Sequence, residues 1–223
     1  TIKEFNSVTK KNDAVRRCSS EGYYCDKISI EKLKHFVSKE AFNIDGFGKK
    51  IVENFWKLNL IKFPQDIFNL NYNEIEKLDG WGKLSVENLK YSINEKKKIS
   101  LEKFIYSLGI RHIGLENAKL LAKHFETFLN FKDLSKTKKY LDLLNIDGIG
   151  ETQVNSIQNF FSNKKNTDVV DKLAKILTIS NSLSHRKNGF LKGKTFLVTG
   201  KLNGISRAEV KSLIEENSGT TVS

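Results

Sequence analysis

The sequence contains no methionine, one proline and two cysteines among its 223 residues. A natural chain starts with methionine, so Thr1 in the first position suggests a fragment or a processed product. Because no signal peptide precedes Cys18 and Cys25, a disulfide scaffold is not expected. No run of 18 apolar residues is present, so the sequence predicts no membrane span and a cytoplasmic protein.

Basic residues are in clear excess. Lysine and arginine number 38 against 26 acidic residues, which gives a net charge of +12 spread along the chain. A folded protein with this charge is suited to lie along a polyanion, because each neutralised phosphate releases counterions. The alternative is a solvated surface rich in lysine, but an excess of this size favours nucleic acid as the partner.

Four segments share one pattern of glycine and apolar residues: Asn43–Phe55, Lys77–Leu89, Gly109–Leu121 and Asn145–Ile157. Their anchor glycines Gly48, Gly82, Gly114 and Gly150 are 34, 32 and 36 residues apart. An apolar residue precedes each anchor, and further apolar residues follow it at the fourth and seventh positions. Those two positions share one face of a helix, so each unit predicts a tight turn that begins an amphipathic helix.

A second helical pattern precedes each turn, with Ser29, Pro64 and Ser100 as expected helix starts. The predicted unit is helix, glycine turn, helix, repeated four times. One such hairpin cannot bury its apolar face alone, so the repeats should pack as one domain.

This pattern resembles the helix-hairpin-helix motif, which implies sequence-independent DNA binding by main-chain amides. Glycine permits positive φ and a close backbone approach, and amides at a helix N-terminus bind anions. We expect a β-branched residue at Gly48 or Gly82 to block such a site, on the expectation that these glycines have positive φ. The candidate DNA-binding residues are Gly46, Gly48, Lys49, Lys50, Gly80, Gly82, Lys83, Arg111, His112, Gly114, Gly148 and Gly150.

The third turn departs from the pattern, because His112 stands where the other turns have Gly46, Gly80 and Gly148. We expect this turn to be made differently, with Arg111 compensating.

The second turn also contains the K-x-D-G pattern of nucleotide-loading lysines, at Lys77 to Gly80. The same column of the repeat holds Asn43, Gly109 and Asn145, so the turn does not require lysine. No further nucleotide-pocket motif is present, and we interpret Lys77 as a coincidental match.

Six residues separate Cys18 from Cys25. Two cysteines alone cannot close a tetrahedral structural zinc site, because such a site takes four ligands. The nearest other candidate, His35, lies in an amphipathic helix, where packing or capping is the expected role. Two unpaired thiols and half of a zinc site remain equal alternatives.

After the repeats, the polar segment 181–189 is typical of a linker. A strand core at 196–198, a helix with Ser206 and Glu209 in a capping box, and a second strand from Thr220 predict a β-α-β arrangement. Gly193-Lys194-Thr195 precedes its strand, which excludes a phosphate-binding loop.

In this order, these features closely resemble the C-terminal half of bacterial NAD-dependent DNA ligases. The resemblance implies a mainly α protein: a partial zinc finger (1–27), a four-repeat helix-hairpin-helix domain (28–182), a linker (183–189) and a truncated α/β BRCT domain (190–223). It implies zinc on Cys18 and Cys25, in a site that is incomplete in this chain.

The family seals nicks in duplex DNA, using NAD and a divalent cation such as magnesium, both bound outside the region matched here. The resemblance therefore implies an inactive, monomeric fragment that clamps nicked duplex DNA and does not bind membranes. The alternatives are a non-catalytic interaction module of a repair complex and, with less support, a nuclease accessory domain.

Overall fold

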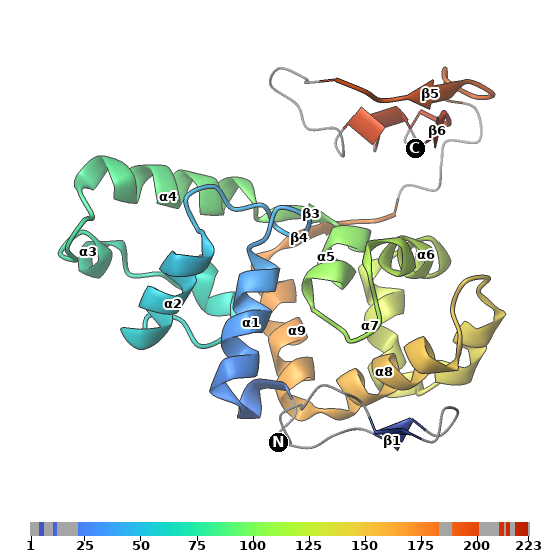
Figure 1. Cartoon of the computed structure of the whole chain (residues 1–223), viewed down its shortest axis with the longest axis horizontal. Coiled ribbons are helices and arrows are strands. Elements are labelled where there is room, and N and C mark those ends of the chain that lie inside the picture. The colour runs from blue at the N-terminus through green and yellow to red at the C-terminus, as the bar shows by residue number, and fades with distance from the viewer. Residues whose placement is uncertain are drawn as a thin grey trace.

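The computed structural model describes residues 5–6, 11–12, 22–182, 189–200, 210–211, 213–214 and 217–222 (Figure 1). Helices dominate this part of the chain, as the sequence predicts. The α-helices are α1 Asp26–Phe36, α2 Lys49–Lys57, α3 Tyr72–Ile75, α4 Lys83–Glu95, α5 Leu101–Ser107, α6 Leu115–Phe125, α7 Phe128–Thr137, α8 Glu151–Ser162 and α9 Lys164–Ile176. The 3-10 helices are η1 Gly22–Tyr24, η2 Pro64–Asn69 and η3 Tyr140–Asn145. The strands are β1 Phe5–Asn6, β2 Lys11–Asn12, β3 Lys98–Ser100, β4 Thr178–Ser180, β5 Thr195–Leu197 and β6 Thr220–Val222. Among the described residues, no helix has the length and apolar character needed to cross a membrane.

All four predicted hairpins are present. Helices α2, α4, α6 and α8 each begin directly after the anchor glycine of their repeat. The apolar residues four and seven positions after these glycines are all 6% exposed or less. The period of the repeat therefore identified both the helices and the faces that they bury.

The predicted helix starts are confirmed at two positions and wrong at one. Pro64 occupies the first position of η2, and Ser100 is the N-cap of α5. Helix α1, however, begins at Asp26 with Cys25 as its N-cap. Ser29 lies inside this helix, 1% exposed, and its hydroxyl donates to the Cys25 carbonyl at 3.0 Å. That bond holds Ser29 within the first turn, so it cannot stand before the helix.

Two of the helices expected before a turn are interrupted. Before the second turn, Leu70 is extended and 7% exposed, and it separates η2 from α3. Burial of this side chain outweighs continuation of the helix. Before the fourth turn, Lys138 adopts a left-handed conformation with φ 54° and ends α7, after which η3 leads into the turn.

Helices α2, α3 and α4 lie on one side of α1 and α9, and helices α5, α6, α7 and α8 lie on the other (Figure 1). A short parallel pairing joins them: Lys98, Ile99 and Ser100 of β3 face Thr178, Ile179 and Ser180 of β4. The Thr178 N–H also donates to the Lys97 carbonyl at 2.8 Å. The segment between the two pairs of hairpins is thus fixed to the segment that leaves the last hairpin.

Two side chains of α1 bind the C-terminal end of α5. The Lys32 ammonium donates to the carbonyls of Leu108 and Gly109 at 3.3 and 3.2 Å. His35 Nε2 lies 2.8 Å from the Tyr106 carbonyl oxygen, and the two rings pack with centroids 4.6 Å apart. The last carbonyls of a helix lack intrahelical donors, so these contacts cap α5. The predicted packing or capping role of His35 is confirmed.

Lys32 is also held by aromatic rings, since its ammonium lies 5.6 Å from the ring centre of Tyr23 and 5.7 Å from that of Phe160. Nearby, the Lys165 ammonium lies 3.8 Å from the ring centre of Tyr24. These contacts attach η1 to α1 and to the α8–α9 junction. Burial lowers the pKa of Lys32 from 10.5 to about 8 and raises that of Tyr23 above its ordinary range.

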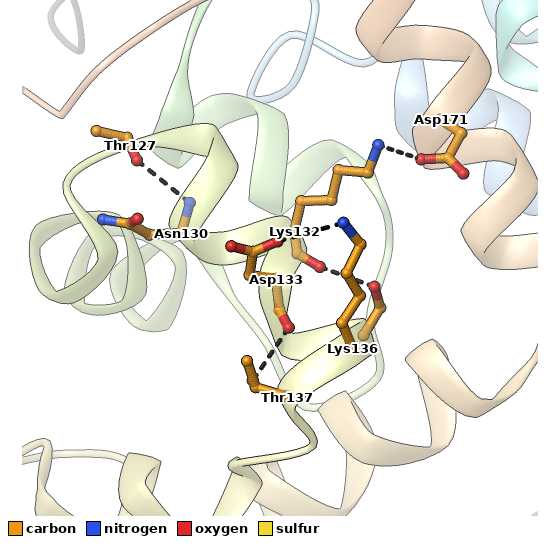
Figure 2. Close-up of polar contacts among 8 residues, drawn as sticks. Thr127, Asn130, Lys132, Asp133, Lys136, Thr137 and Asp171 are labelled. Carbon is orange, nitrogen blue, oxygen red and sulfur yellow. Dashed lines mark hydrogen bonds and ion pairs between the residues drawn. The ribbon is translucent and has the colours of Figure 1, made fainter.

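Helix α7 is attached to α9 by an ion pair between Lys132 and Asp171 at 2.5 Å (Figure 2). The N-terminus of α7 is capped by Thr127, whose hydroxyl accepts from the Asn130 N–H at 3.2 Å. In the core beside this pair, the Phe131 ring packs against Phe125 and Phe161 with centroids 5.6 and 5.3 Å apart. The aromatic contacts bury α7, and the ion pair adds little because both partners are partly exposed.

The predicted β-α-β arrangement is confirmed in its strand pairing, because β5 and β6 are parallel with Thr195 facing Thr220. Parallel neighbours require a crossover between them. The capping residues Ser206 and Glu209 lie outside the described residues, as does most of the predicted linker.

Substitution of Lys32 tests the cost of burying its charge. The pKa of the Lys32 ammonium is 10.5 in the unfolded chain and about 8 in the folded protein. The unfolded state therefore binds more protons between these values, and stability should rise with pH in that window. We expect the free energy of unfolding, relative to a Lys32→Met variant, to increase from pH about 8 to about 10 in urea titrations. A constant difference across this range would contradict the assignment.

Candidate nucleic-acid interface

The four turns, defined as Ile44–Gly48, Leu78–Gly82, Ile110–Gly114 and Ile146–Gly150, have one backbone geometry. In each, the N–H before the last glycine donates to the carbonyl of the first residue: Phe47 to Ile44, Trp81 to Leu78, Ile113 to Ile110 and Ile149 to Ile146, at 3.0–3.2 Å. The carbonyl of each last glycine then accepts the first helical hydrogen bond, from Val52, Val86, Ala118 and Val154. The repeat seen in the sequence is therefore a repeat of hydrogen bonds.

Positive φ occurs at the first glycine of the turn and not at the second. Gly46, Gly80 and Gly148 have φ of 77°, 79° and 89°, the left-handed region that glycine enters without steric cost. Gly48 and Gly82 have φ of −73° and −109° and are extended N-cap residues. The expectation of positive φ at Gly48 and Gly82 was therefore wrong.

The third turn is not made differently. His112 takes the left-handed conformation itself, with φ 61°, and the hydrogen bond that closes the turn is retained. Histidine is one of the residues that tolerate this region at modest cost. Its carbonyl accepts from the Asn117 side chain at 3.1 Å, which adds a contact at this turn. The expected compensation by Arg111 is not needed for the backbone.

The second glycines leave open space in front of the helix amides. A β-carbon built on Gly48, Gly82 or Gly114 would meet no atom within 4 Å. Internal packing therefore gives no reason for glycine at these positions. Among the described residues, the N–H groups of Gly48 and Gly82 have no hydrogen-bond acceptor. The first helical N–H groups that follow them also lack intrahelical acceptors, so each turn presents a group of free donors to solvent.

The fourth turn is different, because its donor is already bonded. The Gly150 N–H donates to the Gln153 side-chain carbonyl at 3.2 Å. A β-carbon on Gly148 would approach Leu120 of α6 at 2.9 Å, so this turn also packs closely against the third hairpin. The fourth turn therefore satisfies its own amide and contributes to packing between repeats.

The charged residues at the start of each helix also separate the first two turns from the last two. Lys49 and Lys50 begin α2 and Lys83 begins α4; all three are exposed, and neither helix has an acid in its first turn. By contrast, Glu116 lies in the first turn of α6 and Glu151 in that of α8. A carboxylate at this place satisfies the helix dipole and repels a phosphate. The first two turns are the better anion sites, because the third hairpin carries Glu116 as well as Arg111.

A groove of about 540 Å³ lies between the first two hairpins. Its lining comprises Asp45, Gly46 and Ile51 of the first hairpin and Gly80, Trp81, Ser85, Asn88, Leu89 and Ser92 of the second. Trp81 also packs against Phe55 of α2 with ring centroids 5.5 Å apart. The two turns with the better anion sites are therefore neighbours across one groove. The sequence analysis missed Ser85, Asn88 and Ser92, although their helical spacing could have indicated a shared face.

Lys77 is an exposed residue on the approach to the second turn. Its N–H donates to the Glu74 carbonyl at 3.2 Å, and Asp79 of the K-x-D-G pattern is exposed as well. Lys77 does not line the groove. The pattern therefore reflects the residues of a turn, as expected.

The described residues do not form a zinc site. Cys25 is the N-cap of α1, and Cys18 lies outside the described residues. Within the described ranges, no three histidine, cysteine, aspartate or glutamate side chains gather closely enough to hold a metal. His35 is committed to the Tyr106 carbonyl. A tetrahedral site would therefore need ligands beyond these residues.

Repeated hairpins of this geometry define a class of protein, and comparison with known proteins agrees. The family model of the helix-hairpin-helix motif matches residues 103–170, which hold the third and fourth hairpins. The first two hairpins have the same turn hydrogen bonds. Residues 103–170 thus match the helix-hairpin-helix motif, and the first two hairpins share its turn geometry.

Comparison with individual proteins is more specific than the match to the motif. The DNA ligase of Pelagibacter ubique (strain HTCC1062) is 66% identical over 223 residues, which are 100% of this chain and 33% of that protein. DNA ligases of Rickettsia canadensis (strain McKiel) and Rickettsia rickettsii (strain Sheila Smith) are 41% and 42% identical over 216 residues, 92% of this chain and 31% of each relative. The chain is therefore similar to these DNA ligases over 92–100% of its own length and spans about one third of the length of these relatives.

Alanine at the two glycines of one turn should have different effects on stability. At Gly46, an L-residue must adopt the left-handed conformation, which costs about 1–2 kcal/mol. At Gly48, the backbone is extended and a β-carbon meets open space, so the loss should stay within about 1 kcal/mol. Urea unfolding of Gly46→Ala and Gly48→Ala measures both. A larger loss for Gly48→Ala would contradict the assignment of the two positions.

Proposed function

We propose that this chain is the DNA-binding part of an NAD-dependent DNA ligase, which seals nicks between a 5′-phosphate and a 3′-hydroxyl. The observation that carries the proposal is the pair of turns with free amides, Gly48 and Gly82, each followed by exposed lysine across one groove. The DNA ligase relatives support it. Amides and lysines of this kind bind phosphate without reading bases, which suits a protein that acts at any nick.

The first and second hairpins supply most of this contact. Each phosphate would accept hydrogen bonds from the second-glycine N–H and the first helical N–H groups, with Lys49, Lys50 and Lys83 adding attraction. The third hairpin contributes less, through Arg111 and His112, because Glu116 opposes an anion. The fourth hairpin serves chiefly to pack against the third, since Gly150 is already bonded.

The same proposal places the adenylation chemistry outside this chain. NAD and a divalent cation such as magnesium would act there, and this chain would be a monomeric, catalytically inactive clamp on nicked duplex DNA in the cytoplasm. For zinc, the proposal is limited to Cys18 and Cys25 as two of four ligands. Residues 190–223 would be the start of a BRCT domain, and the parallel pairing of β5 and β6 supports this.

Binding of duplex DNA tests the proposal directly. We expect the 223-residue chain to bind nicked and intact duplexes of unrelated sequence with similar affinity, measured by fluorescence anisotropy. The logarithm of the binding constant should fall linearly with the logarithm of salt concentration, by about 0.9 for each phosphate neutralised. Absence of binding at low salt, or strong dependence on base sequence, would refute it.

Alanine at the second glycine distinguishes the turns. Gly82→Ala would place a β-carbon in the open space where a phosphate approaches the amides, so affinity should fall about tenfold. Gly150→Ala is the matched control, because its amide is already bonded to Gln153, and it should bind DNA like the parent chain. Equal losses in the two variants would show that the fourth turn contacts DNA as strongly as the second.

A further inference from the structure

Helix α1 lies between the two groups of hairpin helices, and one set of its contacts joins it to the first turn (Figure 1). The ring of Phe36 stacks on that of Phe42 with centroids 4.2 Å apart, and both side chains are 2% exposed or less. Phe42 lies two residues before Ile44, where the first turn begins. Lys34 also pairs with Glu53 of α2 at 2.7 Å. Helix α1 and the first turn therefore belong to one packed unit.

A second set of contacts joins α1 to the chain directly before the third turn. Lys32 lies two positions before Lys34, which places the two side chains on opposite faces of the helix. Lys32 and His35 donate to three carbonyls at the end of α5, those of Leu108, Gly109 and Tyr106, at 2.8–3.3 Å. Ile110 follows these residues and begins the third turn. Helix α1 thus contacts the starts of two turns that belong to different hairpins.

The backbone at Gly109 fits closely against both side chains. It is left-handed, with φ 59°. A β-carbon built there would lie 3.4 Å from His35 Cδ2 and 3.8 Å from Lys32 Nζ. Glycine therefore permits both the conformation and the close approach at this point. Arg111, which is exposed in the third turn, comes two residues later.

The need to fill space does not explain a lysine at position 32. The ammonium lies near the rings of Tyr23 and Phe160, and burial of its charge lowers its pKa to about 8. An apolar side chain would pack against the same rings without the cost of burying a charge. What the ammonium adds is its pair of bonds to carbonyls that lack donors within α5.

We propose that Lys32 and His35 are positioning residues for DNA binding, which hold the third turn in place relative to the first so that Arg111 reaches the same duplex. The inference rests on the proposed function and extends it to side chains that act through the backbone of a turn. The Lys32 ammonium is already bonded to two carbonyls, so its effect on DNA is indirect.

A double-mutant cycle separates positioning from a general loss of stability. In the parent chain, Arg111→Ala should weaken duplex binding about threefold to tenfold and reduce the salt slope by about 1. In a Lys32→Met background the third turn is no longer held, so adding Arg111→Ala should change affinity by less than about twofold. Lys83→Ala should cause the same loss in both backgrounds, because the second turn does not depend on these bonds. Fluorescence anisotropy with the 223-residue chain measures each affinity.

Lys165→Met is the matched control for Lys32→Met. The Lys165 ammonium also contacts an aromatic ring, that of Tyr24, and donates to a carbonyl, that of Tyr23, at 3.4 Å. These contacts hold η1 and not the third turn, so Arg111→Ala should keep its full effect in this background.

His35 provides a second, independent test. His35→Ala should reduce the effect of Arg111→Ala, and His35→Gln should restore it, because the glutamine amide can also donate to the Tyr106 carbonyl. Melting followed by circular dichroism shows whether each variant is folded. If Lys32→Met does not fold, the two His35 variants decide the question.

Three results have distinct meanings. If Arg111→Ala weakens binding as much in the Lys32→Met and His35→Ala backgrounds as in the parent chain, the two residues contribute to stability alone and the inference is wrong. If Arg111→Ala has no effect in a parent chain that binds DNA, the third turn makes no contact and the inference is also wrong. If the parent chain does not bind duplex DNA, the proposed function itself fails.

Discussion

The backbone hydrogen bond that closes each hairpin turn is the contact on which the rest of this structure depends. It joins the apolar residue that begins the turn to the N–H before the last glycine, and it requires a left-handed residue between them. Once it forms, the next helix begins at a fixed point with its first N–H groups unbonded. The same bond also turns the chain back on itself, so that consecutive helices can bury their apolar faces together.

A shared backbone does not give the four turns a shared role. In the first two, free amides, lysine and open space coincide at Gly48 and Gly82. In the last two, Glu116 and Glu151 occupy the start of the helix, and in the fourth turn Gln153 also bonds the Gly150 amide that a ligand would need. The last two hairpins instead pack closely, with Gly148 against Leu120. The four hairpins thus share one backbone unit, while their side chains leave the amides of the first two open and pack the fourth against the third.

The sequence predicted the helices well because their evidence is local. Apolar residues at fixed distances from Gly48, Gly82, Gly114 and Gly150 determine which faces are buried, and the structure confirms every one. The position of the strained residue was not predictable in the same way, because two glycines per turn leave the choice open. The third turn shows which position is left-handed, because His112 replaces the first glycine and still has positive φ.

Contacts between segments that are distant in the sequence could not be predicted from local patterns. Lys32 and His35 cap a helix more than 70 residues away, and no local pattern marks a side chain for that role. The breaks at Leu70 and Lys138 have a related cause. Each interrupts a helical pattern because burial or a turn at that point suits the packing of the whole domain, which outweighs local propensity.

Two lysines show why neither a motif nor a perturbed pKa is sufficient to identify a nucleophile. Lys77 has the K-x-D-G pattern, but it is exposed and lies outside the groove. Lys32 has the lowered pKa that a nucleophilic amine needs, but its ammonium is bonded to two carbonyls and lies near two aromatic rings. A reactive amine requires both a shifted pKa and open space for the atom that it attacks. Lys32 fails the second condition, because its ammonium is enclosed by these carbonyls and rings, and for Lys77 the pattern is accounted for by the turn.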